Sequence, residues 1–213
     1  MDTLITVQQF AAFLAASILI TLAPGPDNLM VLSLGIARGR RLGVAFGLGC
    51  GAGCLNHSVL AALGVSAVIA ASQTAFMALK VAGGLYLVWL GVRAILGARA
   101  LAGPGAAPAA ADESARRLFF RGLLANAINP KVILFFLAFL PQFVDGARGH
   151  TGWQIMQLGV VFTVQAALIF ALIGWFSGAI GERLARRPRL ALWLDRAAGG
   201  IFVLLGARLI VGR

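Results

Sequence analysis

Charged side chains are scarce in this sequence of 213 residues. They make up 12% of it, about half the share usual in a soluble domain, whereas 60% of the residues are hydrophobic. This shortage excludes an ordinary soluble domain and predicts an integral membrane protein that lies in the lipid bilayer. No Lys or Arg precedes the first apolar run. The basic region of a cleaved signal peptide is therefore lacking, and we expect that run to remain as a span.

Signatures of catalysis are lacking as well. The sequence has no GxxxxGK phosphate loop, no HExxH and no GxSxG, which removes the sequence signs of ATP hydrolysis and of the usual intramembrane hydrolases. We therefore expect neither enzyme activity nor a cofactor. The formal net charge is +11, but the basic residues alternate with apolar segments instead of forming one face. They are interpreted as topology signals, and no nucleic-acid partner is expected.

Cysteine is nearly absent, with only Cys50 and Cys54, four residues apart in an apolar stretch. Two thiols without histidine or acidic ligands in register make a poor metal site, so no bound metal is expected. Packing of two small side chains explains the pair better. The alternative is a membrane-embedded thiol-redox conduit. It is weakened because both thiols share one helix, whereas a relay needs partners that approach and separate.

Long apolar segments are abundant, and each of six is long enough to cross a bilayer. They run roughly over Phe10–Ala37, Leu42–Ala71, Ala75–Leu96, Leu123–Val144, Trp153–Ile180 and Leu190–Val211. Arginines gather after the first, third and fifth segments and are nearly absent from the other two loops. By the positive-inside rule, those three loops are cytoplasmic and both termini face outward.

The first apolar segment is interrupted by Pro24, Gly25 and Pro26, which Asp27 and Asn28 follow directly. Each proline removes a backbone donor and clashes with the preceding turn. In hydrocarbon, such a break is tolerated only where it is buried in protein or lines a wet cavity. Counting about 20 residues back from the first arginine cluster puts the break near mid-membrane. A carboxylate at that depth is costly, so Asp27 is a candidate functional residue; a plain kink with a solvated Asp27 is the alternative.

A stretch rich in glycine, alanine and proline divides the chain. Residues 98–117 have little apolar surface to bury and are expected to form a mobile cytoplasmic linker. Residues 1–97 and 118–213 then form two three-span halves of one membrane domain.

The two halves look related. Gly83–Leu87 matches Gly199–Val203, and a second proline break, at Asn129 and Pro130, opens the second half as Pro24–Asn28 opens the first. In each half a charged residue follows the proline directly, here Lys131. Because three spans are an odd number, the second copy must lie upside down. The sequence therefore predicts an all-α membrane protein of six helices, with a 3+3 inverted repeat and broken first and fourth helices.

Paired broken helices point to a binding site at the bilayer midplane. Lys131 lies roughly 15 Å from the cytoplasmic side by helical rise, although a lysine at that depth could also snorkel to the interface. Opposite charges at Asp27 and Lys131 would suit a zwitterion. Side-chain amides near the breaks can form hydrogen bonds either with the backbone groups that the breaks leave free or with a substrate. The sequence leaves both roles open for Asn28, Asn126 and Asn129.

His57 is an isolated polar residue in the second apolar segment. Because histidine titrates near neutrality, it is a candidate proton carrier, together with Asp27. A neutral His57, hydrogen-bonded between helices, is the equally weighted alternative. Gln165, in the fifth segment, either faces the cavity or bonds a neighbouring helix, and we favour the second role.

A family resemblance follows from these motifs. Pro24–Asn28 with Ala37–Gly43, then Gly122–Lys131, resemble the LysE/RhtB amino-acid exporter family; Leu79–Gly91 is similar to that family's third span, and Leu140–Phe143 to the end of its fourth. The match covers nearly the whole chain in order and spacing.

The resemblance implies a secondary transporter of the inner membrane that expels amino acids or related metabolites, coupled to the proton gradient. Its partners would be a small amino-acid substrate, protons and the bilayer; the oligomeric state stays open, a homo-oligomer included. In that family an acidic residue often stands three positions before the histidine of the second span. Here Cys54 stands there instead, which puts proton coupling through His57 alone in question. The competing interpretations are the thiol-redox conduit and a non-transporting scaffold, which gives no reason for charges at Asp27 and Lys131.

Overall fold

The computed structural model describes residues 4–97 and 113–211, and every regular element within them is helical. The prediction of an all-α protein is therefore confirmed for the described residues. In chain order the elements are α1 (Val7–Leu22), α2 (Pro26–Arg38), α3 (Arg40–Leu60), the π-helix η1 (Ala61–Val65), α4 (Ser66–Ala71), α5 (Gln73–Leu96), α6 (Ala115–Ala127), α7 (Pro130–Leu134), the π-helix η2 (Phe135–Phe139), the 3₁₀-helices η3 (Leu140–Phe143) and η4 (Gly146–Arg148), α8 (Thr151–Trp175), α9 (Ser177–Arg186) and α10 (Pro188–Val211).

Both predicted helix breaks are present. Pro26 takes the first position of α2, where a missing N–H costs no intrahelical bond, and α1 and α2 meet at 57°. Pro130 takes the same position in α7, and Asn129 caps that helix by accepting from the backbone N–H of Lys131 at 3.1 Å. The angle between α6 and the segment Pro130–Phe143 is 50°.

The number of membrane crossings is established only in part. By length and composition, three described helices could cross a membrane, or up to five if each bent pair is one span. The count of six stays a prediction. The expected fifth span is too long, because α8 ends at Trp175 and Ser177–Arg186 forms the separate helix α9. The expected linker lies outside the described residues up to position 112, and residues 115–117 are already helical in α6.

Glycines let α3 approach two neighbours closely. A Cβ added at Gly49 would collide with the backbone of α6, and one at Gly53 would meet the Asn126 side chain. Gly47 and Gly51 lie against the backbone of α8 in the same way. Small residues in two rows therefore place α3 between α6 and α8, with no room for a side chain at the contacts.

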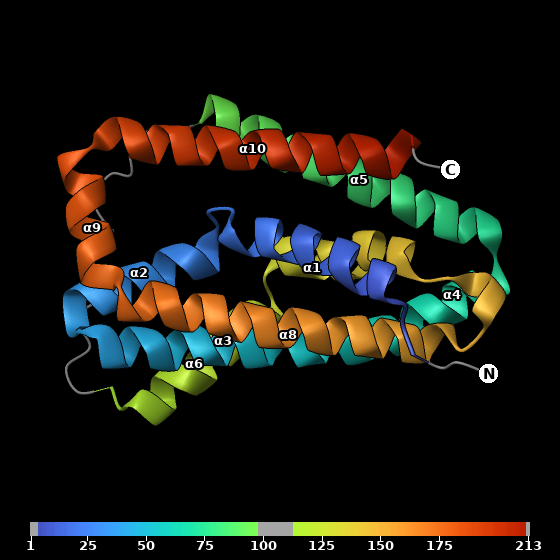
Figure 1. Cartoon of the computed structure of the whole chain (residues 1–213), viewed down its shortest axis with the longest axis horizontal. Helices are drawn as coiled ribbons and strands as arrows, with labels where there is room; N and C mark the ends of the chain where they lie inside the picture. The colour runs from blue at the N-terminus through green and yellow to red at the C-terminus, as the bar shows by residue number, and fades with distance from the viewer. Residues whose placement is uncertain (1–3, 98–112, 212–213) are drawn as a thin grey trace.

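The related glycine motifs pack against each other. A Cβ at Gly84 of α5 would meet the carbonyl of Gly206 in α10, and one at Gly206 would meet the carbonyl of Gly84. Gly91 and Gly199 face each other with the same reciprocity. The two helices therefore run antiparallel in close backbone contact, as the uppermost pair in Figure 1 shows.

The arginines at the end of α2, at the start of α3 and in α6 lie at one end of the molecule, here called the arginine end. Glu113 joins α2 and α6 there, since its carboxylate lies 3.1 Å from both Arg38 and Arg121. The Arg40 guanidinium stacks 4.3 Å from the ring centre of Trp175, where α8 ends. α9 crosses this end, whereas α1 begins and α10 ends at the opposite end (Figure 1).

An aromatic core joins α1, α8 and the segment from η2 to η3. Its rings contact one another at centroid separations of 4.9–6.0 Å. This phenylalanine cluster consists of Phe13, Phe135, Phe136, Phe139, Phe143 and Phe162.

Candidate binding site between the two helix breaks

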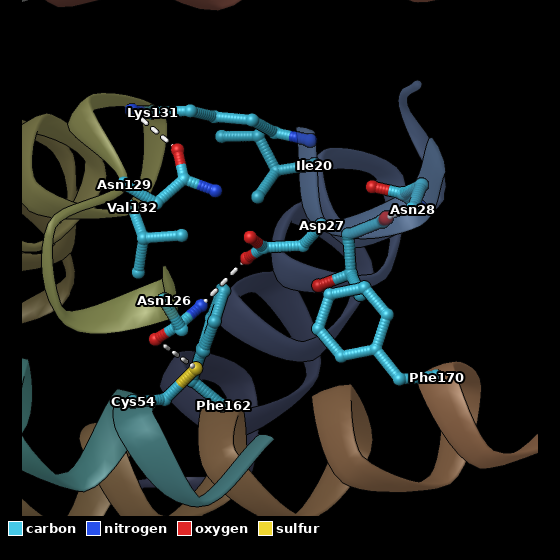
Figure 2. A pocket seen from close by; sticks show the side chains of 11 residues that line it. Ile20, Asp27, Asn28, Cys54, Asn126, Asn129, Lys131, Val132, Phe162 and Phe170 are labelled. Carbon is cyan, nitrogen blue, oxygen red and sulfur yellow. Dashed lines mark hydrogen bonds between the residues drawn. The ribbon is translucent and has the colours of Figure 1, made fainter. Parts of the chain in front are cut away.

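A small cavity lies where the two helix breaks face each other (Figure 2). Its volume is about 20 Å³, roughly room for one water molecule. It is lined by residues of both breaks and of α1, α3 and α8: Ile20, Thr21, Asp27, Asn28, Cys54, Asn126, Asn129, Lys131, Val132, Phe162 and Phe170. Six of these lining residues belong to the predicted site or its alternatives, and the fold brings them together from distant parts of the sequence.

The first break exposes backbone carbonyls because Pro24 and Pro26 interrupt the helical bonding pattern. The Asn28 side chain donates to the carbonyl of Thr21 at 2.8 Å. The Lys131 ammonium donates to the carbonyl of Ala23 at 2.7 Å, and thus sits where the partial negative charge of the α1 C-terminus is greatest. Both carbonyls are satisfied by side chains instead of by the next helical turn.

The second break changes the bonding of the Asn126 carbonyl, whose partner in an unbroken helix would be the backbone N–H of Pro130 and which here accepts from the backbone N–H of Asn129 at 2.9 Å. Proline has no such hydrogen. The Nε2 atom of His57 lies 3.0 Å from this carbonyl oxygen. Because a carbonyl only accepts, Nε2 must carry the hydrogen. His57 is therefore bonded between helices, and its role in proton coupling stays a prediction.

Asn126 connects the two breaks. Its Nδ2 group donates to Oδ2 of Asp27 at 2.8 Å, and its Oδ1 lies 3.6 Å from the Cys54 thiol (Figure 2). Asn126 is fully buried, and its backbone carbonyl contacts His57 as well. A continuous path thus runs from His57 through Asn126 to Asp27.

Asp27 and Lys131 are both buried, with 4% and 8% of their surfaces exposed, yet they do not bind each other. Among the described residues, each is bonded to a neutral partner: Asp27 to the Asn126 amide and Lys131 to the Ala23 carbonyl. The Lys131 ammonium also lies 5.4 Å from the ring centre of Phe202. Two opposite charges therefore line one cavity without neutralising each other by direct contact.

The remaining residues of the predicted site are prolines and a glycine, which shape the backbone of the two breaks. Pro26 and Pro130 begin the second half of each broken helix, and Pro24 lines a neighbouring cavity toward the arginine end. Gly25 allows the Lys131 side chain to pass, because a Cβ at Gly25 would lie 3.3 Å from Nζ.

Thr21 is a cavity residue that the sequence did not single out. Its hydroxyl accepts from Nε2 of Gln165 at 2.9 Å, which confirms the expectation that Gln165 bonds a neighbouring helix. A threonine in an apolar helix gives no sequence signal of its own, and only the position of Gln165 opposite it marks the site.

The two cysteines are buried and free. Cys54 lines the cavity, whereas Cys50 belongs to the apolar core. No group of three or more potential metal ligands occurs among the described residues.

Comparison with known proteins identifies the family. Residues 18–213 match the family described as LysE type translocator. The chain is 32% identical to the threonine efflux protein of Escherichia coli K12 over 90% of this chain and 92% of that protein. It is 32% identical to the homoserine/homoserine lactone efflux protein of Salmonella typhimurium over 98% of both chains. The leucine efflux protein of an Enterobacter strain is 30% identical over 95% of both.

No solved structure matches the chain significantly. The relatives do not support the thiol-redox alternative, because they are named as efflux proteins. With the family match covering all but the first residues and these relatives aligning over nearly their full lengths, the chain belongs to the family of LysE type translocators.

Proposed function

We propose that this protein exports small neutral amino acids across the inner membrane as a secondary transporter. The observation that carries the proposal is the pair of buried, oppositely charged side chains, Asp27 and Lys131, that line one cavity while bonded only to neutral groups. Charges in a membrane interior are costly and mark a substrate or ion pathway by default. The names of the relatives, which are threonine, homoserine and leucine efflux proteins, supply the substrate class.

The two charges of a zwitterion are complementary to the two charges that line this cavity. The Lys131 ammonium would exchange its bond to the Ala23 carbonyl for one to the substrate carboxylate. The Asp27 carboxylate would receive the substrate ammonium beside the Asn126 amide. Each cavity charge would then meet an opposite charge, which adds a direct charge pair at sites where the present hydrogen bonds involve only one ionised group. Asn28 and Asn129, which also line the cavity, supply further donors and acceptors.

The proton pathway would follow the contacts of Asn126. His57 contacts the backbone carbonyl and Asp27 the side-chain amide of the same asparagine, so one residue links the two candidate proton carriers. This arrangement supports coupling of export to the proton gradient through the pair. Cys54 occupies the position at which the family often has an acid, and its thiol contributes a weak hydrogen bond to Asn126.

Alternating access would follow from an inverted repeat of two three-span halves. The contacts of Gly84 with Gly206 and of Gly91 with Gly199 support this arrangement, because the early glycine of each motif meets the late glycine of the other across an antiparallel pair. Breaks of 57° and 50° at equivalent places in the two halves support it as well. Substrate sites in such transporters lie at the interface of the repeats near mid-membrane.

Export is tested with purified protein in liposomes. Vesicles are loaded with labelled threonine, homoserine or leucine, and efflux is followed with and without an imposed pH gradient. Asp27→Asn and Lys131→Gln should each lower the rate at least about tenfold, the effect of losing 1.4 kcal/mol of binding.

Matched controls come from an exposed ion pair on α9. Glu182→Gln removes one carboxylate and Arg186→Gln removes one cation, and exposed pairs of this kind contribute little. Both controls should transport at the wild-type rate. Wild-type protein that moves none of the three amino acids would refute the proposal, and so would normal transport by both cavity variants.

A further inference from the structure

A second, larger cavity lies toward the opposite end of the molecule. Its volume is about 500 Å³, compared with about 20 Å³ for the cavity between the breaks. α1 contributes to both: Ala12 and Ala16 line the large cavity, and Ile20, one helical turn further, lines the small one. The large cavity is completed by Phe76, Lys80, Phe139, Pro141, Gln142, Phe143, Val144, Leu205 and Arg208.

The charged residues in this lining all carry the same sign. Lys80 on α5 and Arg208 on α10 are both cationic, and none of the lining residues is acidic. Lys80 stands seven residues after the start of α5, which places its backbone roughly 10 Å along the helix from that end. It is a buried residue with 8% of its surface exposed, and what exposure it has is toward this cavity. A buried lysine inside a membrane helix indicates a functional position and not a solubilising one.

The two cations come from the pair of helices that the glycine contacts hold together. Gly84, one turn beyond Lys80, lies against Gly206, which is two residues before Arg208. Because of this backbone contact, the helix that carries Lys80 and the helix that carries Arg208 have little freedom to move relative to each other. The backbone positions of both residues are therefore fixed by the packing of α5 on α10.

We propose that this cavity is an exit site that binds the carboxylate of the exported amino acid through Lys80 and Arg208. The inference rests on the proposed function and its orientation, with the opposite end facing outward. Substrate that leaves the central cavity passes along α1 into a space that is large enough for an amino acid and whose charged residues, among those of the described lining, attract a carboxylate. Lysine and arginine recognise carboxylates by charge-assisted hydrogen bonds.

The exit site is tested by the effect of external ligands on efflux. Right-side-out vesicles are loaded with labelled threonine, and unlabelled threonine or its carboxamide, threoninamide, is added outside. The measurement is the external concentration that gives half of the maximal effect on the efflux rate. Lys80→Gln and Arg208→Gln should each raise this concentration about tenfold for threonine and leave it unchanged for threoninamide, which has no carboxylate.

Three controls separate this role from a structural one. Lys80→Arg keeps the charge and should retain the preference for threonine over threoninamide. Arg93→Gln removes a cation from the same helix at the arginine end, where the guanidinium lies 5.2 Å from the ring centre of Trp89, and should behave as wild type. Arg208 is an exposed residue, so its variant should fold even where a change at Lys80 does not.

The outcomes distinguish the two proposals. Wild-type efflux with an unchanged threonine preference in both glutamine variants would overturn the exit site alone. Absence of any wild-type efflux would overturn the proposed export and the exit site with it. The same variants are compared in vesicles of neutral lipid and in vesicles that also contain anionic lipid. A defect that appears only with anionic lipid would overturn the proposal, because the cations would then serve a lipid headgroup.

Discussion

Exchanging the two buried charges, Asp27 and Lys131, distinguishes two roles for them. Either each charge binds the substrate, or the two only form an ion pair with each other. The double variant Asp27→Lys with Lys131→Asp keeps the net charge and would restore a direct ion pair, if one existed. In the structure, however, each charge has its own neutral partner. We therefore expect the double variant to stay inactive.

The magnitude follows from the two hydrogen bonds that are lost. A hydrogen bond to a charged group contributes about 1.5–3 kcal/mol, so loss of both costs roughly 3–6 kcal/mol. The Ala23 carbonyl, which now accepts from Lys131 at 2.7 Å, also loses its side-chain donor, because an aspartate at position 131 has no hydrogen to donate and is too short to reach it. An energy of 3 kcal/mol corresponds to a change of more than a hundredfold in an equilibrium constant, so part of the lost stability should appear in unfolding as well.

The assay combines efflux from liposomes with thermal unfolding in detergent, for the two single variants and the exchanged pair. We expect all three to lose efflux and the exchanged pair to melt at the lowest temperature. Recovery of substantial efflux by the exchanged pair, with inactive single variants, would show that the charges act by pairing. The assignment of the two charges to the two ends of a zwitterion would then be wrong.

Further changes test other parts of the proposal. Single cysteines at Ala107 and Gly149, in a background without the native cysteines, should be labelled from opposite sides of the membrane; labelling from one side would contradict the predicted topology. His57→Gln should flatten the pH dependence of efflux, because histidine is the side chain that most readily changes charge near neutral pH, and an unchanged profile would leave His57 as a structural residue. Exchange of both native cysteines for serine should preserve efflux, whereas a redox conduit would lose all activity. Gly91→Leu should destabilise the protein by about 1–3 kcal/mol through a collision with the backbone of α10, and an unchanged melting temperature would show that the two helices separate easily.

The sequence predicts the site well because prolines and charges in an apolar segment have few explanations. Asp27 and Lys131, 104 positions apart by their numbers, are expected to lie together from the paired breaks, their opposite charges and their depth in the membrane, and they line one cavity; substrate binding there stays a prediction. The partners of these charges could not be predicted. Which side chain reaches the carbonyl of Ala23 or of Asn126 depends on how the helices cross, and that is set by the tertiary packing.

Two features of the fold could not be predicted from the sequence for a similar reason. Apolar residues continue past Trp175, so hydropathy extends the fifth segment through residues that turn into α9. Glu113 lies in a stretch whose composition is typical of a linker, yet its side chain is 7% exposed and bound to Arg38 and Arg121. Composition reports the average of a segment and cannot identify one residue that is anchored by distant partners.

The proposed export requires movement at the helix breaks, because the central cavity of about 20 Å³ is too small for an amino acid. The long helices are poor candidates for that movement, since α3, α5, α8 and α10 are in backbone contact at their glycines. The segment after Pro130 differs: it is α-helical for only five residues, then a π-helix and then a 3₁₀-helix, and irregular turns of this kind mark hinges and functional sites. The ring centre of Phe135 in this segment lies 4.9 Å from that of Phe162, which lines the central cavity, and 5.2 Å from that of Phe139, which lines the large cavity, so this ring links the linings of the two cavities. A shift of this one segment would open the central cavity toward Lys80 and Arg208 while the glycine contacts stay in place.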